Sequence, residues 1–256
     1  MAKRRQSENS SARDTIILTI VAVALAAYCV AFGLQTLVWF EVRHWAGANP
    51  WIRDVPAALA SPTVADGGTQ LRAYDYELKV PWDGKPKTTA TLGQTEFHFD
   101  SGPTLLFYDP EAQADMAKSL GSENPAQYQR FENALGGQSL DTNYAIYQAV
   151  YSASPAAVSP FTSLTNAIRV NQLLLWKIAF GADAAPGLHS IQFGNNRGFE
   201  FGDPDSGRPV ALRIFDGRDK QFRFVFLNAA GATAKIRQSD IDLAVQSLQP
   251  VPITER

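Results

Sequence analysis

Cysteine is almost absent from this chain of 256 residues, because the only one, Cys29, lies in an apolar segment near the N-terminus. Residues 41–256 contain none, which excludes a disulfide framework and leaves hydrophobic burial to stabilise the fold. For a domain outside the cytoplasm, a lack of disulfides is more typical of a bacterial periplasm or cell surface than of a small animal ectodomain.

Signatures of catalysis are also lacking. The sequence contains no Gly-x-Ser-x-Gly nucleophile elbow, no phosphate loop with Gly-Lys-Ser/Thr, no His-Glu-x-x-His and no Cys-x-x-Cys. Serine hydrolase, nucleotide hydrolase, zincin and thiol redox functions therefore lose support. A catalytic triad assembled from distant residues is recognised by its geometry, so an enzyme stays open as an alternative. We expect no catalytic activity and no cofactor.

Charged side chains are missing from one long stretch, the 26 residues from Thr15 to Phe40. A helix of that length measures roughly 39 Å, which exceeds the ~30 Å hydrocarbon core of a bilayer. The sequence thus predicts one transmembrane helix, in contact with lipid over residues 15–40. Basic residues predominate before it, which predicts a cytoplasmic N-terminus. Lys3, Arg4, Arg5 and Arg13 precede the helix, and only Arg43 and Arg53 follow it closely.

Two alternatives to a retained anchor concern the same segment. A cleaved signal peptide has an apolar region of about 7 to 15 residues, much shorter than this one. A lipoprotein would use Cys29, but the bulky Tyr28 precedes it and apolar sequence continues beyond it. Trp39, Trp45 and Trp51 lie at the far end of the segment, where indoles favour the headgroup layer. We therefore expect a single-pass protein of the bacterial inner membrane, with the C-terminal domain periplasmic or extracellular.

Composition divides the chain into five segments. These are a cytoplasmic tail (1–14), the transmembrane helix (15–40), a juxtamembrane linker rich in Gly, Pro and small residues (41–70), the exported domain (71–250) and a C-terminal tail (251–256). The net charge of the chain is -2, and its first 40 residues carry four basic and two acidic side chains, so the exported part carries -4. This charge excludes a broad basic surface for nucleic acid.

Hydrophobic periodicity predicts the elements of the exported domain. Period-two alternation indicates a strand at 72–80, a hairpin at 96–108 and four successive strands between 189 and 226, with turn residues between them that favour an antiparallel meander. The pattern of apolar residues predicts three or four helices within 110–180 and a final helix at 238–248. The expected fold is α+β: a mainly antiparallel sheet with helices packed on it, preceded by the transmembrane helix.

Three parts of the exported domain suggest a known fold: the sequence Tyr76-Glu77-Leu78-Lys79-Val80-Pro81-Trp82, the hairpin from Phe97 to Phe107, and the ending Phe222-Arg223-Phe224 with Asp240-Ile241 and Ser247-Leu248. Together they resemble the fold shared by the photosystem II protein PsbP, the periplasmic lipoprotein DcrB and Mog-type Ran-binding factors. The resemblance implies a non-enzymatic adaptor or assembly factor that binds partners. It carries over no functional residue, and the helical part at 110–180 is longer than that fold implies.

One candidate metal site lies on the first strand of the predicted hairpin. Glu96, His98 and Asp100 alternate with Phe97 and Phe99, so they share one strand face and offer an imidazole and two carboxylates to a divalent metal. The alternation also explains them without a metal, because inward-facing phenylalanines place their neighbours on the solvent face.

A second candidate surface lies in the helical part. Tyr144, Tyr147 and Tyr151 recur at helical spacing and could line a ligand cleft or a partner surface, since a phenol combines apolar area with a polar tip. Packing of a helix on the sheet would produce the same stripe. The sequence therefore favours an anchored domain that binds a protein partner or supports assembly of an envelope complex. The alternatives are a membrane-tethered metal-dependent hydrolase and a small-ligand-binding domain.

Overall fold

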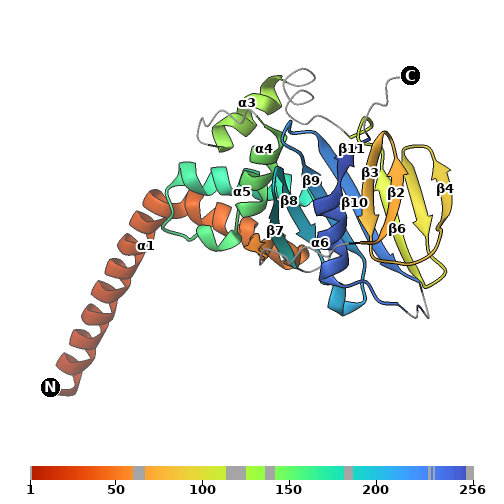
Figure 1. Cartoon of the computed structure of the whole chain (residues 1–256). Coiled ribbons are helices and arrows are strands. Elements are labelled where there is room, and N and C mark those ends of the chain that lie inside the picture. The colour runs from red at the N-terminus through yellow and green to blue at the C-terminus, as the bar shows by residue number, and fades with distance from the viewer. Residues whose placement is uncertain are drawn as a thin grey trace.

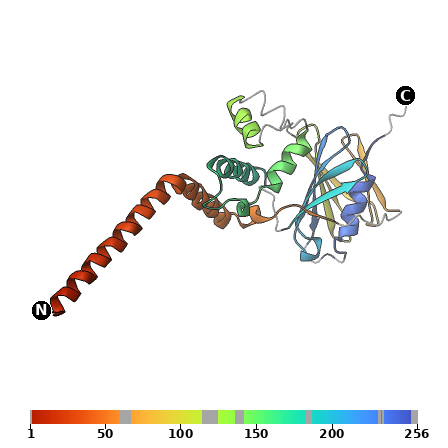
Figure 2. The same ribbon diagram turned by 90° about the vertical axis from the view of Figure 1, so that its left-hand side faces the viewer.

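A computed structural model describes residues 2–59, 67–113, 125–135, 142–181, 187–229, 232 and 234–251. It confirms the α+β class: an apolar N-terminal helix leads into a domain built on a mostly antiparallel sheet with helices packed against it (Figure 1). The large sheet separates two layers, a helical layer beside the N-terminal helix and a second layer on the opposite side (Figure 2).

Eight strands form the large sheet, and all neighbours in it are antiparallel except the first pair. In spatial order they are β1 (Ala57–Ala58), β7 (Leu188–Phe193), β8 (Asn196–Phe201), β9 (Val210–Phe215), β10 (Gln221–Asn228), β6 (Pro103–Tyr108), β5 (Gln94–His98) and β4 (Lys87–Thr91). The predicted hairpin at 96–108 corresponds to β5 and β6, and the predicted four-strand meander to β7 through β10.

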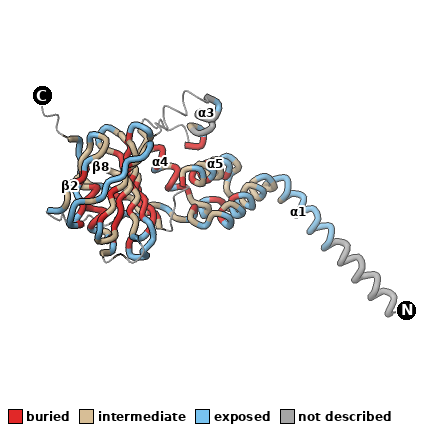
Figure 3. The backbone as a smooth tube through the Cα atoms, turned by 90° about the vertical axis from the view of Figure 1, so that its right-hand side faces the viewer, coloured by how far each residue is buried: buried red, intermediate tan, exposed pale blue. Residues whose placement is uncertain are grey.

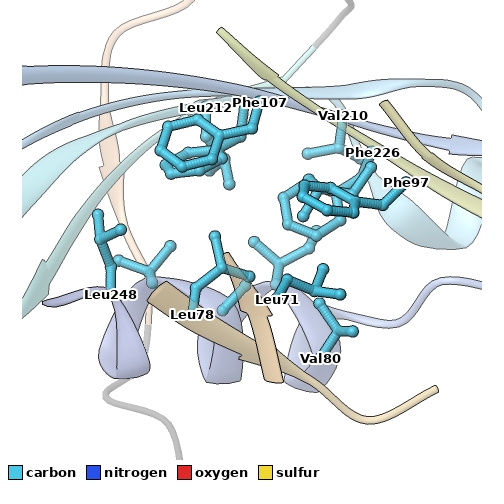
Figure 4. Packing of buried hydrophobic residues seen from close by; sticks show 14 of the residues in the cluster. Leu71, Leu78, Val80, Phe97, Phe107, Val210, Leu212, Phe226 and Leu248 are labelled. Carbon is cyan, nitrogen blue, oxygen red and sulfur yellow. The ribbon is translucent and has the colours of Figure 1, made fainter. Parts of the chain in front are cut away.

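A small sheet and one helix cover the first face of the large sheet. The small sheet contains β2 (Thr69–Ala73), β3 (Tyr76–Val80) and β11 (Gln249–Pro250), and the helix is α6 (Gln238–Ser247). Side chains from both sheets and from the end of α6 meet in one core, which includes Leu71, Leu78, Val80, Phe97, Phe107, Val210, Leu212, Phe226 and Leu248 (Figure 4). The alternate residues of β5, β6, β9 and β10 therefore face the other way.

The helical layer covers part of the second face. It contains α3 (Pro125–Ala134), α4 (Asn143–Ser152), the short 3-10 helix η2 (Pro155–Ala157) and α5 (Leu164–Phe180). A separate core forms where α4 and α5 meet β8 and β9, with Phe199 fully buried against Tyr151 and Phe215 fully buried against Tyr147. Another short 3-10 helix, η3 (Pro204–Ser206), joins β8 to β9.

The N-terminal helix α1 (Ala2–Ala48) continues well past the predicted end of the span at Phe40. Among the described residues it is the one helix long and apolar enough to cross a membrane, over Ile17–Ala48, a property that a signal sequence would share. Its middle part is exposed, whereas its C-terminal part lies against the helical layer (Figure 3).

The predicted linker at 41–70 is structured over its described N-terminal part. After α1, residues Pro50–Arg53 form the 3-10 helix η1, and β1 then pairs with β7 in parallel. Val42, Ala46 and Ile52 are buried in the core of the helical layer. The linker expectation fails there because small and apolar side chains without a clear period still pack on a neighbouring helix.

The single strand predicted at 72–80 is in fact a hairpin. Tyr74 and Asp75 both have positive φ angles, 51° and 61°, and they turn the chain between β2 and β3. Two successive residues with positive φ are the signature of the type I′ hairpin turn, which is usually made by Asn or Gly. Tyr74 lies in the turn but continues the alternation of Tyr76, Leu78 and Val80 in the sequence, so periodicity alone does not show the turn.

Gly198 in β8 is required by the close approach of β9. A Cβ atom at this position would lie 2.1 Å from the carbonyl oxygen of Arg213 and 2.9 Å from the Cα of Ile214.

We expect Gly198→Ala to lower the free energy of unfolding by roughly 3 kcal/mol, because backbone atoms cannot yield as a flexible side chain can. Urea unfolding of the full chain in detergent measures this loss. Gly217→Ala is the matched control, since its Cβ would meet only Asn195 at 3.4 Å; equal stability of both variants would contradict the prediction.

Candidate functional site

The second face of the large sheet is covered by α4 and α5 over β8 and β9. Among the described residues, this cover reaches the continuation on β10, β6 and β5 only at its border, where Val225 packs against the helical core. Register places nine side chains on this continuation, which we call the open face. They are Gln94, Glu96 and His98 on β5, Thr104, Leu106 and Tyr108 on β6, and Arg223, Val225 and Leu227 on β10. All but Thr104 are partly exposed.

The centre of the open face is apolar. Leu106 lies directly opposite Val225, and both are half-buried. Leu227 extends the apolar area toward Thr104, its neighbour on β6. Beside this centre, the guanidinium of Arg223 stacks 4.4 Å from the ring centroid of Tyr108. The face thus combines aliphatic side chains with one aromatic ring and one cation.

A hydrogen-bonded row borders the apolar centre along β5. Gln94 Nε2 donates to Glu96 Oε1 at 2.7 Å, and Glu96 Oε2 lies 3.0 Å from His98 Nε2. The other ring nitrogen, His98 Nδ1, lies 3.1 Å from Thr104 Oγ1 on β6. Each of these side chains is fixed by its neighbour, so the row presents a preorganised set of polar groups.

Two arginines meet where the open face adjoins the helical layer. Arg213 on β9 lies directly opposite Arg223 on β10, and like charges in this position repel. The guanidinium of Arg213 stacks on Tyr147 at 4.2 Å from the ring centroid. A small pocket lies beside both arginines and is also lined by Phe180 and Phe201.

The predicted tyrosine stripe lies in α4 and packs on the sheet. Tyr147 and Tyr151 are 3% and 0% exposed, so they form no accessible partner surface in this structure. Tyr144 is half-buried, stacks on Phe199 and carries the guanidinium of Arg197 at 4.1 Å from its ring centroid. Burial raises the pKa of Tyr147, against the opposing effect of the Arg213 charge and hydrogen bond. Core packing is therefore the role that the described contacts give this stripe.

The predicted metal trio is brought together only in part. Glu96 and His98 are in contact on the open face, whereas Asp100 follows the end of β5 and is exposed. Both ring nitrogens of His98 already have partners, Glu96 and Thr104. Within the described parts of the chain, no three His, Cys, Asp or Glu side chains are grouped closely enough to hold a metal ion.

Sequence reasoning did not identify the open face as a unit. Leu106, Tyr108, Arg223 and Val225 fall within the predicted hairpin at 96–108 and the predicted strands between 189 and 226, with nothing that joins them into one surface. A usable signal was present, because Phe222, Phe224 and Phe226 define the core side of β10 and thereby assign Arg223 and Val225 to the other side. What the sequence could not show is that the helical layer covers β8 and β9 and reaches β10 at Val225.

Comparisons of this chain with known protein families, with curated proteins and with solved structures found no match. The resemblance to the fold of PsbP, DcrB and Mog-type factors therefore stays a prediction from the sequence. Function has to be inferred from the geometry of this chain alone.

Proposed function

We propose that this chain is a single-pass membrane protein whose outward-facing domain binds a protein partner through the open face, and that it supports assembly of an envelope complex. The apolar helix α1 is consistent with a membrane anchor. The excess of basic residues before it supports a cytoplasmic N-terminus and a domain on the periplasmic or extracellular side. The proposed role is binding and not catalysis.

The composition of the open face carries this proposal. Protein interfaces typically have an apolar centre, a polar rim, and more Tyr and Arg than the rest of a protein surface. Here Leu106 and Val225 supply the centre, the stacked pair of Tyr108 and Arg223 lies beside it, and the row from Gln94 to Thr104 forms the rim. Because the rim groups hold one another in place, docking loses little side-chain entropy.

Site-specific photo-crosslinking in native membranes tests the proposal. A photoreactive phenylalanine analogue replaces either Leu106 or Tyr108 in the full-length chain, and the adducts are identified by mass spectrometry. We expect the same partner at both positions. Gln192 on β7 is the control position, because its side chain is exposed but lies away from the open face.

A charge variant separates specific docking from chance proximity. Leu106→Glu places a carboxylate in the apolar centre, and we expect it to reduce the adduct formed from position 108 at least tenfold, equivalent to about 1.4 kcal/mol of binding free energy. The circular dichroism of the variant should match that of the parent chain, because Leu106 is only half-buried. Adducts that are equal at positions 108 and 192, or that survive Leu106→Glu unchanged, would refute the proposal.

A further inference from the structure

A single exposed aromatic residue lies beside the membrane helix. Phe161, in the turn between η2 and α5, is 72% exposed, and its ring meets that of Phe32 in α1 edge-on at 5.7 Å between centroids. At the other end of α5, a Cβ atom added to Gly181 would overlap the indole of Trp51. The segment from 161 to 181 therefore runs alongside the segment from 32 to 51, in the same direction.

The domain begins to cover α1 at Phe32. From Ile17 to Ala31 the helix is exposed almost all round, with exposed fractions of 49 to 90% for its large apolar side chains. From Phe32 onward, one face of α1 is partly buried, and this burial becomes complete at Val42. The part of α1 that is free of the domain thus ends near Ala31.

That free part is too short to cross a bilayer alone. Residues 15–31 measure roughly 26 Å as a helix, whereas the hydrocarbon core is ~30 Å thick. Arg13 and Asp14 limit the span on its N-terminal side. Counting about 20 residues from Thr15 places the outer hydrocarbon boundary near Leu34, beyond the level of Phe32. Any tilt of α1 moves more of the helix into the core.

The turn that holds Phe161 has the hydrogen bonding that this position requires. The Ser159 N–H donates to Thr162 Oγ1 at 2.9 Å, the Phe161 N–H to Ser159 Oγ at 3.3 Å, and the Thr162 N–H to the Ser159 carbonyl at 3.1 Å. Pro160 has no N–H. Every backbone donor of the turn is thus satisfied internally, which irregular backbone needs at the edge of the hydrocarbon.

Groups suited to the headgroup layer follow in the sequence. Trp39 comes five residues after Leu34, on the part of α1 that lies beside the helical layer, where α1 bends (Figure 2). The guanidinium of Arg43, one turn further, stacks on the Trp39 indole at 4.7 Å from its ring centroid. An indole with a cation above it matches the order of lipid groups from the acyl chains to the phosphates.

From this geometry we propose a second membrane contact of the anchored chain: Phe161 inserts into the outer boundary of the hydrocarbon beside α1, and the occupant of this exposed apolar site is lipid. The contact rests on the proposed membrane anchoring by α1, but not on the partner face. It holds the domain against the bilayer in one orientation.

Fluorescence quenching in vesicles tests this contact on the full-length chain. In a Cys29→Ser background, Phe161→Cys carries the environment-sensitive dye NBD, and the protein is reconstituted in phosphatidylcholine vesicles with a spin label near the top of the acyl chain. We expect a blue-shifted emission and a several-fold greater loss of fluorescence than in the control. The control is Leu92→Cys, which is also exposed but follows β4, the strand at the end of the large sheet opposite to β1.

The outcomes distinguish this contact from the rest of the proposed function. Emission from position 161 that matches position 92 in vesicles that retain the protein would overturn the lipid contact and leave the anchor intact. Failure of the chain to float with vesicles would overturn the anchor together with the contact. Loss of the lipid contact alone leaves the crosslinks expected at Leu106 and Tyr108 unchanged.

Discussion

Replacing Lys177 by methionine is expected to lower the free energy of unfolding by about 4 kcal/mol. Lys177 of α5 is 0% exposed, and its Nζ donates to the carbonyl oxygens of Tyr151 at 2.8 Å and Ala153 at 2.9 Å, at the end of α4. A third bond, at 2.5 Å, reaches the carbonyl of Asp54 between η1 and β1. Methionine fills the volume but leaves three buried carbonyls without this donor.

Denaturant unfolding of the full chain in detergent measures the effect of Lys177→Met. Lys79→Met, on the exposed side of β3, is the matched control and should change stability by no more than about 0.5 kcal/mol. Burial lowers the pKa of Lys177 to about 8, with the Asp54 carboxylate acting in the opposite direction, so the ammonium form still predominates at neutral pH. A loss below about 1 kcal/mol would show that the three bonds contribute little.

The second large effect concerns Glu200, whose side chain on β8 is 1% exposed beneath α6. Its Oε2 accepts a 2.9 Å hydrogen bond from Gln238 Nε2, which also donates to Asp242 Oδ1 at 3.1 Å. Its Oε1 has no hydrogen-bond partner among the described residues. Burial raises the pKa of Glu200 to about 7; the negative charges of Asp242 and Asp203 add to this rise, and the Gln238 hydrogen bond opposes it.

We expect the chain to lose stability as the pH rises toward 7. The folded state keeps the Glu200 proton up to about pH 7, whereas the unfolded chain releases it near 4.5, so the favourable contribution is complete below about 4.5 and lost above 7. The pKa difference corresponds to about 3 kcal/mol. Glu200→Gln, neutral at every pH, should therefore be more stable than the parent chain by about 3 kcal/mol at pH 8 and by only about 1 kcal/mol at pH 5.

Urea unfolding of both proteins across this pH range isolates the contribution of Glu200, because other titrating groups cancel in the difference. Asp205→Asn, which neutralises an exposed carboxylate in η3, serves as the control and should show no comparable gain. A difference between Glu200→Gln and the parent chain that does not vary with pH would contradict the assignment to this carboxyl group.

Periodicity predicted the elements whose two faces differ in polarity. The strand β10 and the helix α6 each have a buried side and a more exposed side, and both were expected. The strand β9 is buried on both faces except at Arg213 and was expected from its apolar residues between two turns. The strand β4 was missed because Lys87–Thr91 is exposed on both faces and so has no apolar side to detect. The two-residue strand β1 was missed for a related reason, since Ala57 and Ala58 carry no pattern.

The open face was harder to predict than the strands, because it depends on which part of the large sheet the helices leave uncovered. Glu96 and His98 were assigned to the correct strand face, and their mutual contact follows from their spacing. Their role beside Leu106 and Val225 depends on where α4 and α5 end, which is decided by tertiary packing. The tyrosine stripe illustrates the same point, because Tyr147 and Tyr151 have a spacing that fits a surface equally well but are buried by β8 and β9.

The packing of α1 on α5 has a mechanical consequence. Since Val42 and Ala46 are buried in the same core as Leu174 and Tyr151, the helix and the domain cannot swivel independently. Turning α1 about its own axis turns the open face by the same angle. If two chains associated through α1, the angle between their open faces would therefore be fixed. The way in which the two α1 helices pack would then determine which partner proteins the two open faces can bind at the same time.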